Sequence, residues 1–179
     1  MLKRGCLILI ATLALVGCDD SPTEPSDPNV VIFTAQLSAA NEVPPITNAE
    51  ANARGDARMI FNLTRDSANN ITGATVDFFV NLNNFPNGST WTLAHIHEGG
   101  PGVAGGVRVN TGLSPANPVV LTNGTVTNQT FADRPIVNAQ GQPDPELVAR
   151  ILNDPGGFYF NAHTTANPGG AVRGQLVRQ

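Results

Sequence analysis

The chain has 179 residues, of which 18 are glycine, 14 are proline and only 13% are charged. This length accommodates one domain around a single core, and glycine and proline among many Val, Thr and Asn residues favour short strands joined by turns. The formal net charge of −4 argues against nucleic acid and anionic lipid as electrostatic partners, because both attract basic surfaces.

The N-terminus has the organisation of an export leader. Lys3 and Arg4 form a positive region, and the apolar run that follows, residues 7–16, is too short to cross a bilayer as a permanent helix. Gly17 precedes Cys18 as in a bacterial lipobox, so we expect cleavage before Cys18 and a lipid on that cysteine. An ordinary secretory signal with an unrelated cysteine is the alternative. Lipidation would attach an exported protein to the bacterial cell envelope by its lipid.

Composition divides the chain into three segments. Residues 1–17 are expected to be a lipoprotein signal peptide. Residues 18–29 are expected to be a disordered tether, because they are rich in proline and acidic residues and contain no large apolar side chain to offset the entropy of ordering. Residues 30–179 form the predicted β domain. The only other cysteine lies in the leader, so no disulfide is expected within the mature chain.

Alternation of apolar and polar residues predicts the strands of the β domain. The clear ones are residues 30–37, 51–63, 71–82, 91–97, 158–163 and 171–177, and the weaker ones are residues 107–109, 119–121 and 124–131. An Asn-Gly turn is expected at Asn123 and Gly124. One short helix is predicted near 145–153, with Asp144 as its N-cap and Pro145 at its first position.

The chain has three histidines, and all lie in two similar passages. His95 and His97 are two residues apart on a predicted strand, so their side chains should share a face, together with Trp91 and Leu93. His163 ends another strand, on the face that also carries Tyr159 and Asn161. A glycine-containing loop and a Val-Arg pair follow each passage, so we expect two similarly built corners.

Three imidazoles on neighbouring strands could bind copper or zinc. The alternative is that His95, His97 and His163 are hydrogen-bonding pegs that fix the two glycine loops, with Glu98, Tyr159 and Asn161 as their partners. Contact with a ligand or a protein is a third role.

The arginines of the two Val-Arg pairs lie at matching places in the two corners. Arg108 and Arg173 are expected to support the site by pairing with an acid, and the candidates are Glu42, Glu98 and Asp56.

Four phrases, in order, resemble the CHRD domain, a module that occurs alone in many exported bacterial proteins. They are LSAANEVPP at residues 37–45, AHIHEG at 94–99, YFNAHT at 159–164 and PGGAVRGQL at 168–176. The resemblance spans about residues 30–177 and implies an antiparallel β-sandwich or barrel, similar in style to immunoglobulin domains. It implies no specific biochemical role.

Two function classes therefore stay open. One is a non-catalytic binding module at the envelope, whose partner is an unidentified protein or small ligand. The other is a copper- or zinc-binding protein that uses the three histidines. An enzyme is the less favoured interpretation, because no serine lies in a nucleophile elbow and no acid–base pair is evident in the sequence.

Overall fold

The structure is a computed structural model that describes residues 27–179. The predicted signal peptide, Cys18 and residues 18–26 of the predicted tether lie outside this range. From Asn29 onward the chain is hydrogen-bonded to the domain, because the Asn29 carbonyl accepts from the Leu63 amide at 2.7 Å. Within residues 27–179, no helix has the length and apolar character needed to cross a membrane.

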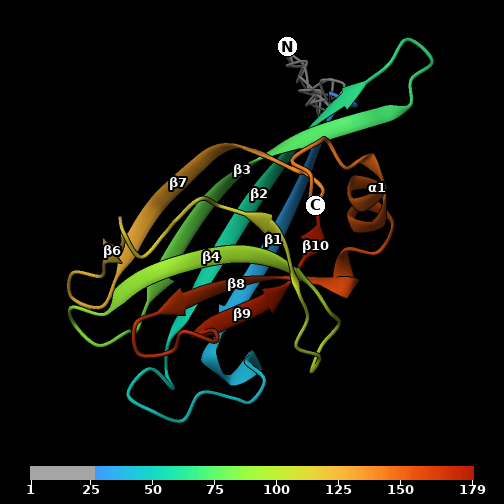
Figure 1. Cartoon of the computed structure of the whole chain (residues 1–179). Coiled ribbons are helices and arrows are strands. Elements are labelled where there is room, and N and C mark those ends of the chain that lie inside the picture. The colour runs from blue at the N-terminus through green and yellow to red at the C-terminus, as the bar shows by residue number, and fades with distance from the viewer. Residues whose placement is uncertain (1–26) are drawn as a thin grey trace, which may run out of the picture.

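The domain is built from antiparallel strands, as predicted. The strands are β1 (Val30–Ser38), β2 (Arg54–Arg65), β3 (Ile71–Asn83), β4 (Thr90–Glu98), β5 (Val107–Asn110), β6 (Val119–Val120), β7 (Val126–Pro135), β8 (Phe158–Thr164), β9 (Val172–Gln175) and β10 (Val177–Arg178). A single sheet runs in the order β5-β4-β8-β9-β1-β2-β3-β7, with β6 beside β4 and β10 beside β1. This sheet curls into a nearly closed barrel, and its end strands β5 and β7 touch (Figure 1).

Large apolar side chains from opposite walls fill the barrel. Phe33 and Phe61 meet edge to face at 5.0 Å on the paired strands β1 and β2. The ring centroids of Phe78 on β3 and Phe160 on β8 are 5.9 Å apart, so this pair packs distant strands of the sheet against each other. Each such ring, fully buried, contributes roughly 1.5–3 kcal/mol relative to an exposed one. The core therefore holds the wall that carries β4 and β8.

The only α-helix in the described part of the chain, α1 (Pro145–Asn153), confirms the predicted helix. Its N-cap is Asp144, whose carboxylate accepts from the Leu147 amide at 2.9 Å. The helix buries Leu147, Val148 and Ile151 and packs against β3. Together with the barrel, α1 confirms the predicted class of an all-β fold with one short helix.

The weakly patterned region forms β6 and β7, with the expected Asn-Gly turn between them. Asn123 and Gly124 both have positive φ, 53° and 70°. A Cβ on Gly124 would lie 1.9 Å from the Phe85 carbonyl oxygen, so the close approach of that backbone requires glycine here.

Most strand boundaries differ from the predicted ones by one to four residues, and two of the differences have a clear local cause. β2 begins at Arg54 rather than at residue 51, because the preceding residues form a turn in which the Ala53 amide donates to the Glu50 carbonyl. The final predicted strand is divided at Leu176, whose amide donates to the Phe158 carbonyl.

The prediction that Trp91 shares a face with His95 and His97 is wrong. Trp91 pairs with Thr164 of β8, whereas Leu93 pairs with the next residue, His163, so β4 contains one extra residue at this point. Such a bulge moves every later side chain to the opposite face. Trp91 is consequently a core residue, and the two histidines of β4 point away from the core.

Candidate functional site

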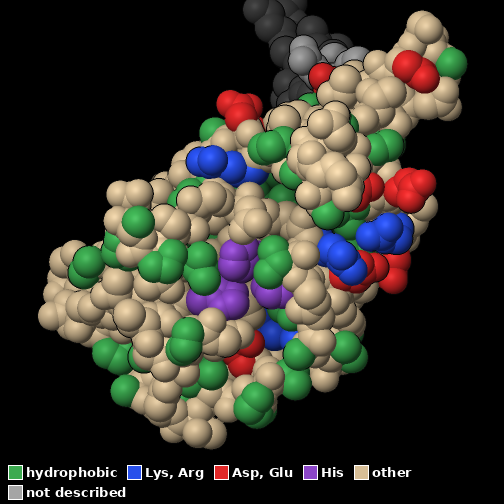
Figure 2. Space-filling model, viewed as in Figure 1, with side chains coloured by type: hydrophobic (Ala, Val, Ile, Leu, Met, Phe, Trp, Pro, Cys, Tyr) green, Lys and Arg blue, Asp and Glu red, His purple; other side chains and the backbone are tan. Residues whose placement is uncertain are grey.

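The three histidines lie side by side on the outer face of the β4–β8 pair. His95 is opposite Asn161 and His97 is opposite Tyr159, while His163 lies one step further along, opposite Leu93. One ring nitrogen from each of the three lies within 4.8 Å of those of the other two. Figure 2 shows the histidines gathered in a hollow of the surface.

The imidazole rings pack against one another and are almost covered. The ring of His95 is centred 5.6 Å from that of His97 and 5.1 Å from that of His163, and the last two are 5.9 Å apart. Their exposed fractions are only 6–8%. The cluster is therefore the nearly buried floor of the hollow rather than three independent surface side chains.

Two of the histidines hold the two glycine loops. The Nδ1 atom of His97 lies 2.9 Å from the Gly105 carbonyl oxygen in the β4–β5 loop. The Nδ1 atom of His163 lies 2.9 Å from the Pro168 carbonyl oxygen in the β8–β9 loop. The two corners thus use the same contact, and the loop partners of the histidines are backbone carbonyls.

These contacts determine which nitrogens are free. A carbonyl oxygen can only accept, so Nδ1 carries the proton in His97 and His163, and each Nε2 keeps a lone pair. The Nε2 atom of His97 is buried without a hydrogen-bond partner in the described part of the protein. The Nε2 atom of His163 lies 3.3 Å from Nδ1 of His95, so it accepts a hydrogen bond from that nitrogen. Ring nitrogens from all three residues therefore meet at one place.

Burial lowers the pKa of all three imidazoles. It lowers the pKa of His95 to about 4, with smaller contributions from the neighbouring His163 and His97. For His97 and His163 the effect of burial on the pKa is partly offset by the hydrogen bonds to Gly105 and Pro168. The rings are neutral at pH 7, the form in which imidazole binds metal ions.

Tyr159 and Arg173 support the first glycine loop. The Tyr159 ring stacks on His97 with a centroid separation of 4.9 Å and an interplanar angle of 8°, and its hydroxyl accepts from the Gly105 amide at 3.1 Å. The Arg173 guanidinium carbon lies 3.5 Å from the centroid of the Tyr159 ring, and the group donates to the Gly100 and Val103 carbonyls. Aromatic and cation–π stacking thus order the loop beside the histidines.

Glu98 and Asn161, which were predicted as partners of the histidines, form no hydrogen bond with them in the described part of the chain. Glu98 turns outward and pairs with Arg108 at 2.8 Å and with Arg150 of α1 at 3.5 Å. Asn161 donates from Nδ2 to both carboxylate oxygens of Glu42, at 2.9 and 3.2 Å.

The two supporting arginines differ in their partners. The predicted acid pairing of Arg108 is present, with Glu98. The acid pairing predicted for Arg173 is absent. Within residues 27–179 no carboxylate oxygen lies within 4.0 Å of the Arg173 guanidinium, and backbone carbonyl oxygens hold this group instead.

Sequence reasoning missed Glu50. Its buried carboxylate accepts from the Thr164 hydroxyl at 2.6 Å, from the Ser89 hydroxyl at 3.1 Å and from the Asn167 amide, so it anchors the start of the second glycine loop. The residues next to Glu50 are mostly small or polar and show no periodic pattern. The partners of its carboxylate lie more than thirty residues away in the chain, so the local sequence does not reveal these contacts.

Glu42 is also buried in the fold. Burial raises the pKa of Glu42 to about 7, against the opposing effects of the Arg173 charge and the Asn161 hydrogen bond. Its carboxyl group is therefore near half-ionised at neutral pH.

Comparison with known proteins supports the predicted resemblance. No curated protein and no solved structure matches the chain. A family model described as the CHRD domain matches residues 33–176, which run from within β1 to the residue before β10 and include all three histidines. The chain belongs to the CHRD domain family.

Proposed function

We propose that this protein is an exported, non-catalytic binding module, anchored to the bacterial envelope by a lipid on Cys18, and that His95, His97 and His163 bind one copper or zinc ion. The observation that carries the proposal is the meeting of ring nitrogens from three neutral, nearly buried imidazoles within 4.8 Å. The leader-like sequence before Cys18 supports the envelope location.

The unpartnered nitrogen of His97 is the strongest support for a ligand here. A buried polar atom without a partner costs free energy, about 1–3 kcal/mol, so such atoms are rare unless something binds them. The Nε2 of His97 is such an atom, and it belongs to the cluster. A metal ion would satisfy it and would take the place of the hydrogen bond between His95 and His163.

The surroundings of the rings also favour a metal. Histidines that ligate metals donate their other ring N–H to a carbonyl or carboxylate, which fixes both the tautomer and the orientation of the ring. His97 and His163 do this through Gly105 and Pro168. The second role assigned to these side chains, as pegs for the loops, is therefore compatible with metal binding.

The kind of ligand atom indicates which metal ions the three histidines would bind. Three imidazole nitrogens suit copper and zinc, whereas calcium and magnesium take oxygen ligands. With three ligands from the protein, the ion would keep a further position for water or a small exogenous ligand.

The proposal is tested by titrating the tag-free protein with Cu(II) and Zn(II), since a histidine tag binds the same metals. We expect a copper ligand-field absorption band that saturates at one equivalent, and a melting temperature that rises with either metal because an ion that binds only the folded state stabilises it. Absence of both the band and the shift would leave the histidines as pegs alone.

A further inference from the structure

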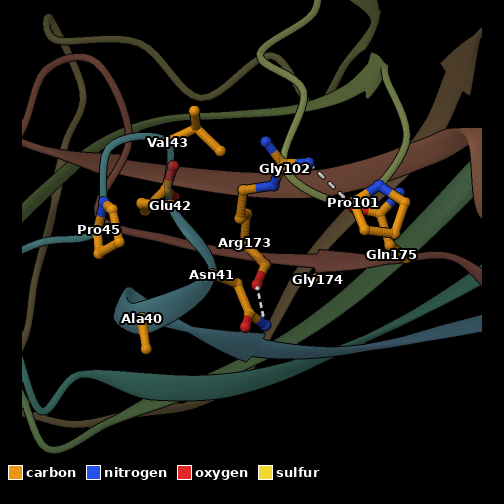
Figure 3. A pocket seen from close by; sticks show the side chains of 10 residues that line it. All are labelled: Ala40, Asn41, Glu42, Val43, Pro45, Pro101, Gly102, Arg173, Gly174 and Gln175. Atoms are coloured by element: carbon orange, nitrogen blue, oxygen red, sulfur yellow. Dashed lines mark hydrogen bonds between the residues drawn. The ribbon is translucent and has the colours of Figure 1, made fainter.

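A second hollow lies between two loops, separate from the meeting point of the histidine nitrogens. It has a volume of about 570 Å³ and opens between the segment after β1 and the first glycine loop, with β9 as its floor (Figure 3). Its polar side chains are Asn41, Glu42, Arg173 and Gln175, and its apolar lining includes Val43, Pro45 and Pro101. This volume is in the range of small-molecule sites.

Two opposite charges line this pocket without pairing with each other. Glu42 is 7% exposed and Arg173 is 2% exposed. No nitrogen of Arg173 lies within 4.0 Å of a Glu42 oxygen, and neither residue forms another ion pair within residues 27–179. Buried charges are costly unless they are paired and hydrogen-bonded, so a group between these two side chains that carries both signs of charge would stabilise the ionised Glu42 and the Arg173 guanidinium together.

Both side chains retain hydrogen-bonding capacity. A guanidinium has five N–H donors, and Arg173 makes three hydrogen bonds, to the carbonyls of Gly100 and Val103 and to the side chain of Gln175. Within residues 27–179, the Glu42 carboxylate accepts from a single side chain, Asn161, although its two oxygens offer about four acceptor positions.

The two uncharged polar side chains in the pocket, Asn41 and Gln175, are engaged in hydrogen bonds within the protein. Asn41 donates from Nδ2 to the Arg173 carbonyl oxygen at 3.2 Å. The Nε2 atom of Gln175 donates to the carbonyls of Gly99, Gly156 and Phe158, and its Oε1 accepts from Arg173. The pocket therefore offers a ligand an acidic acceptor at Glu42 and a basic donor at Arg173.

We propose that this pocket binds a small zwitterion of the amino-acid type, with its ammonium group on Glu42 and its carboxylate on Arg173. Each contact is a charge-assisted hydrogen bond. The ligand brings one charge of each sign, so it neutralises both buried side chains and adds no net charge to the pocket. Val43, Pro45 and Pro101 form the apolar surface that an aliphatic side chain of the ligand would cover. The proposal does not depend on metal at the histidines.

Titration of the metal-free wild-type protein with a panel of small ions tests the pairing of charges. The zwitterionic probes are glycine, L-proline and γ-aminobutyrate, and the probes with a single charge are methylamine and acetate. Binding is measured by calorimetry and by the chemical shifts of the protein amides. We expect at least one zwitterion to bind at least tenfold more tightly than either single-charge probe. The proposal is overturned if methylamine or acetate binds as tightly as every zwitterion, or if no zwitterion binds below about 10 mM.

A charge-removing variant tests the role of Glu42. Glu42→Gln keeps the shape of the side chain and should weaken zwitterion binding at least tenfold. Glu98→Gln is the matched control, because Glu98 faces Arg108 and Arg150 outside the pocket, and it should bind like the parent. Circular dichroism establishes that both variants are folded, and metal analysis excludes chelation of residual metal by the amino acids. Equal affinity of Glu42→Gln and the parent would refute the assignment.

Discussion

At the scale of single residues, each of two histidines uses its two ring nitrogens for different purposes. In His97 and His163, Nδ1 holds a glycine loop, and Nε2 belongs to the cluster. A substitution that keeps one nitrogen position and removes the other can therefore separate loop support from metal binding.

His97→Asn should make this separation. The Asn amide nitrogen can take the place of Nδ1 and donate to the Gly105 carbonyl, but nothing replaces Nε2. We expect metal affinity to fall by at least tenfold while the melting temperature of the metal-free protein changes little. Calorimetric titration and thermal denaturation measure the two effects. Loss of folding without metal present, or unchanged affinity, would contradict the dual role.

Glu42→Gln should alter the dependence of stability on pH. A raised folded-state pKa means that the fold favours the protonated acid, so the contribution of Glu42 to stability is fully present below pH 4.5 and is lost as pH rises through about 7. Gln stays neutral, so the variant should gain stability relative to the parent between pH 4.5 and pH 8, by about 3 kcal/mol at most.

Urea denaturation of both proteins at several pH values measures the difference. The histidines titrate in both proteins, so their effect largely cancels in the comparison. A difference that does not change with pH would show that Glu42 has an ordinary pKa.

At the scale of elements, a bulge and two glycine loops build the candidate site. The extra residue in β4 turns His95 and His97 outward while Trp91 stays in the core. The β4–β5 loop then folds back so closely that a Cβ on Gly105 would lie 1.6 Å from the Glu98 carbonyl oxygen, whereas a Cβ on Gly106 would meet nothing within 4 Å. Close backbone approach therefore makes Gly105 indispensable to this corner.

Gly105→Ala should displace the loop, and with it the carbonyl that orients His97. We expect a stability loss of about 1–3 kcal/mol and weaker metal binding, with Gly106→Ala as a neighbouring control that changes neither by much. Denaturant unfolding and metal titration check the pair. Similar behaviour of the two variants would show that this loop conformation does not support the histidines.

At the scale of the whole molecule, the barrel core holds the strands that carry the site. Phe78 lies inside the barrel and contacts Phe160 of β8, whereas its neighbour Phe79 faces outward, where the Arg58 guanidinium lies 5.8 Å from its ring. Phe78→Ala should cost about 3–5 kcal/mol because it leaves a cavity. Phe79→Ala should cost about 1 kcal/mol, because an outward-facing ring leaves no cavity behind. Comparable losses in urea denaturation would contradict the assignment of the two faces.

The sequence predicted what depends on local pattern. Alternating side chains and the Asp144-Pro145 start identified most strands and the helix, because period and capping are properties of neighbouring residues. Paired phrases placed His95 and His163 in similar corners. The bulge in β4 was not predictable, since alternation through Trp91 and Leu93 is unbroken in the sequence and the extra residue is defined only by pairing with β8. The contacts of Glu50 and the orientation of Glu98 were likewise set by distant elements.

Binding of one metal ion by the three histidines can be measured as the metal content per chain. Tag-free protein is loaded with copper or zinc and passed through gel filtration, for the parent and for His97→Asn. We expect one ion per chain in the parent and well below one in the variant. A parent content well below one, or equal contents in the two proteins, would show that the histidines do not form the metal site.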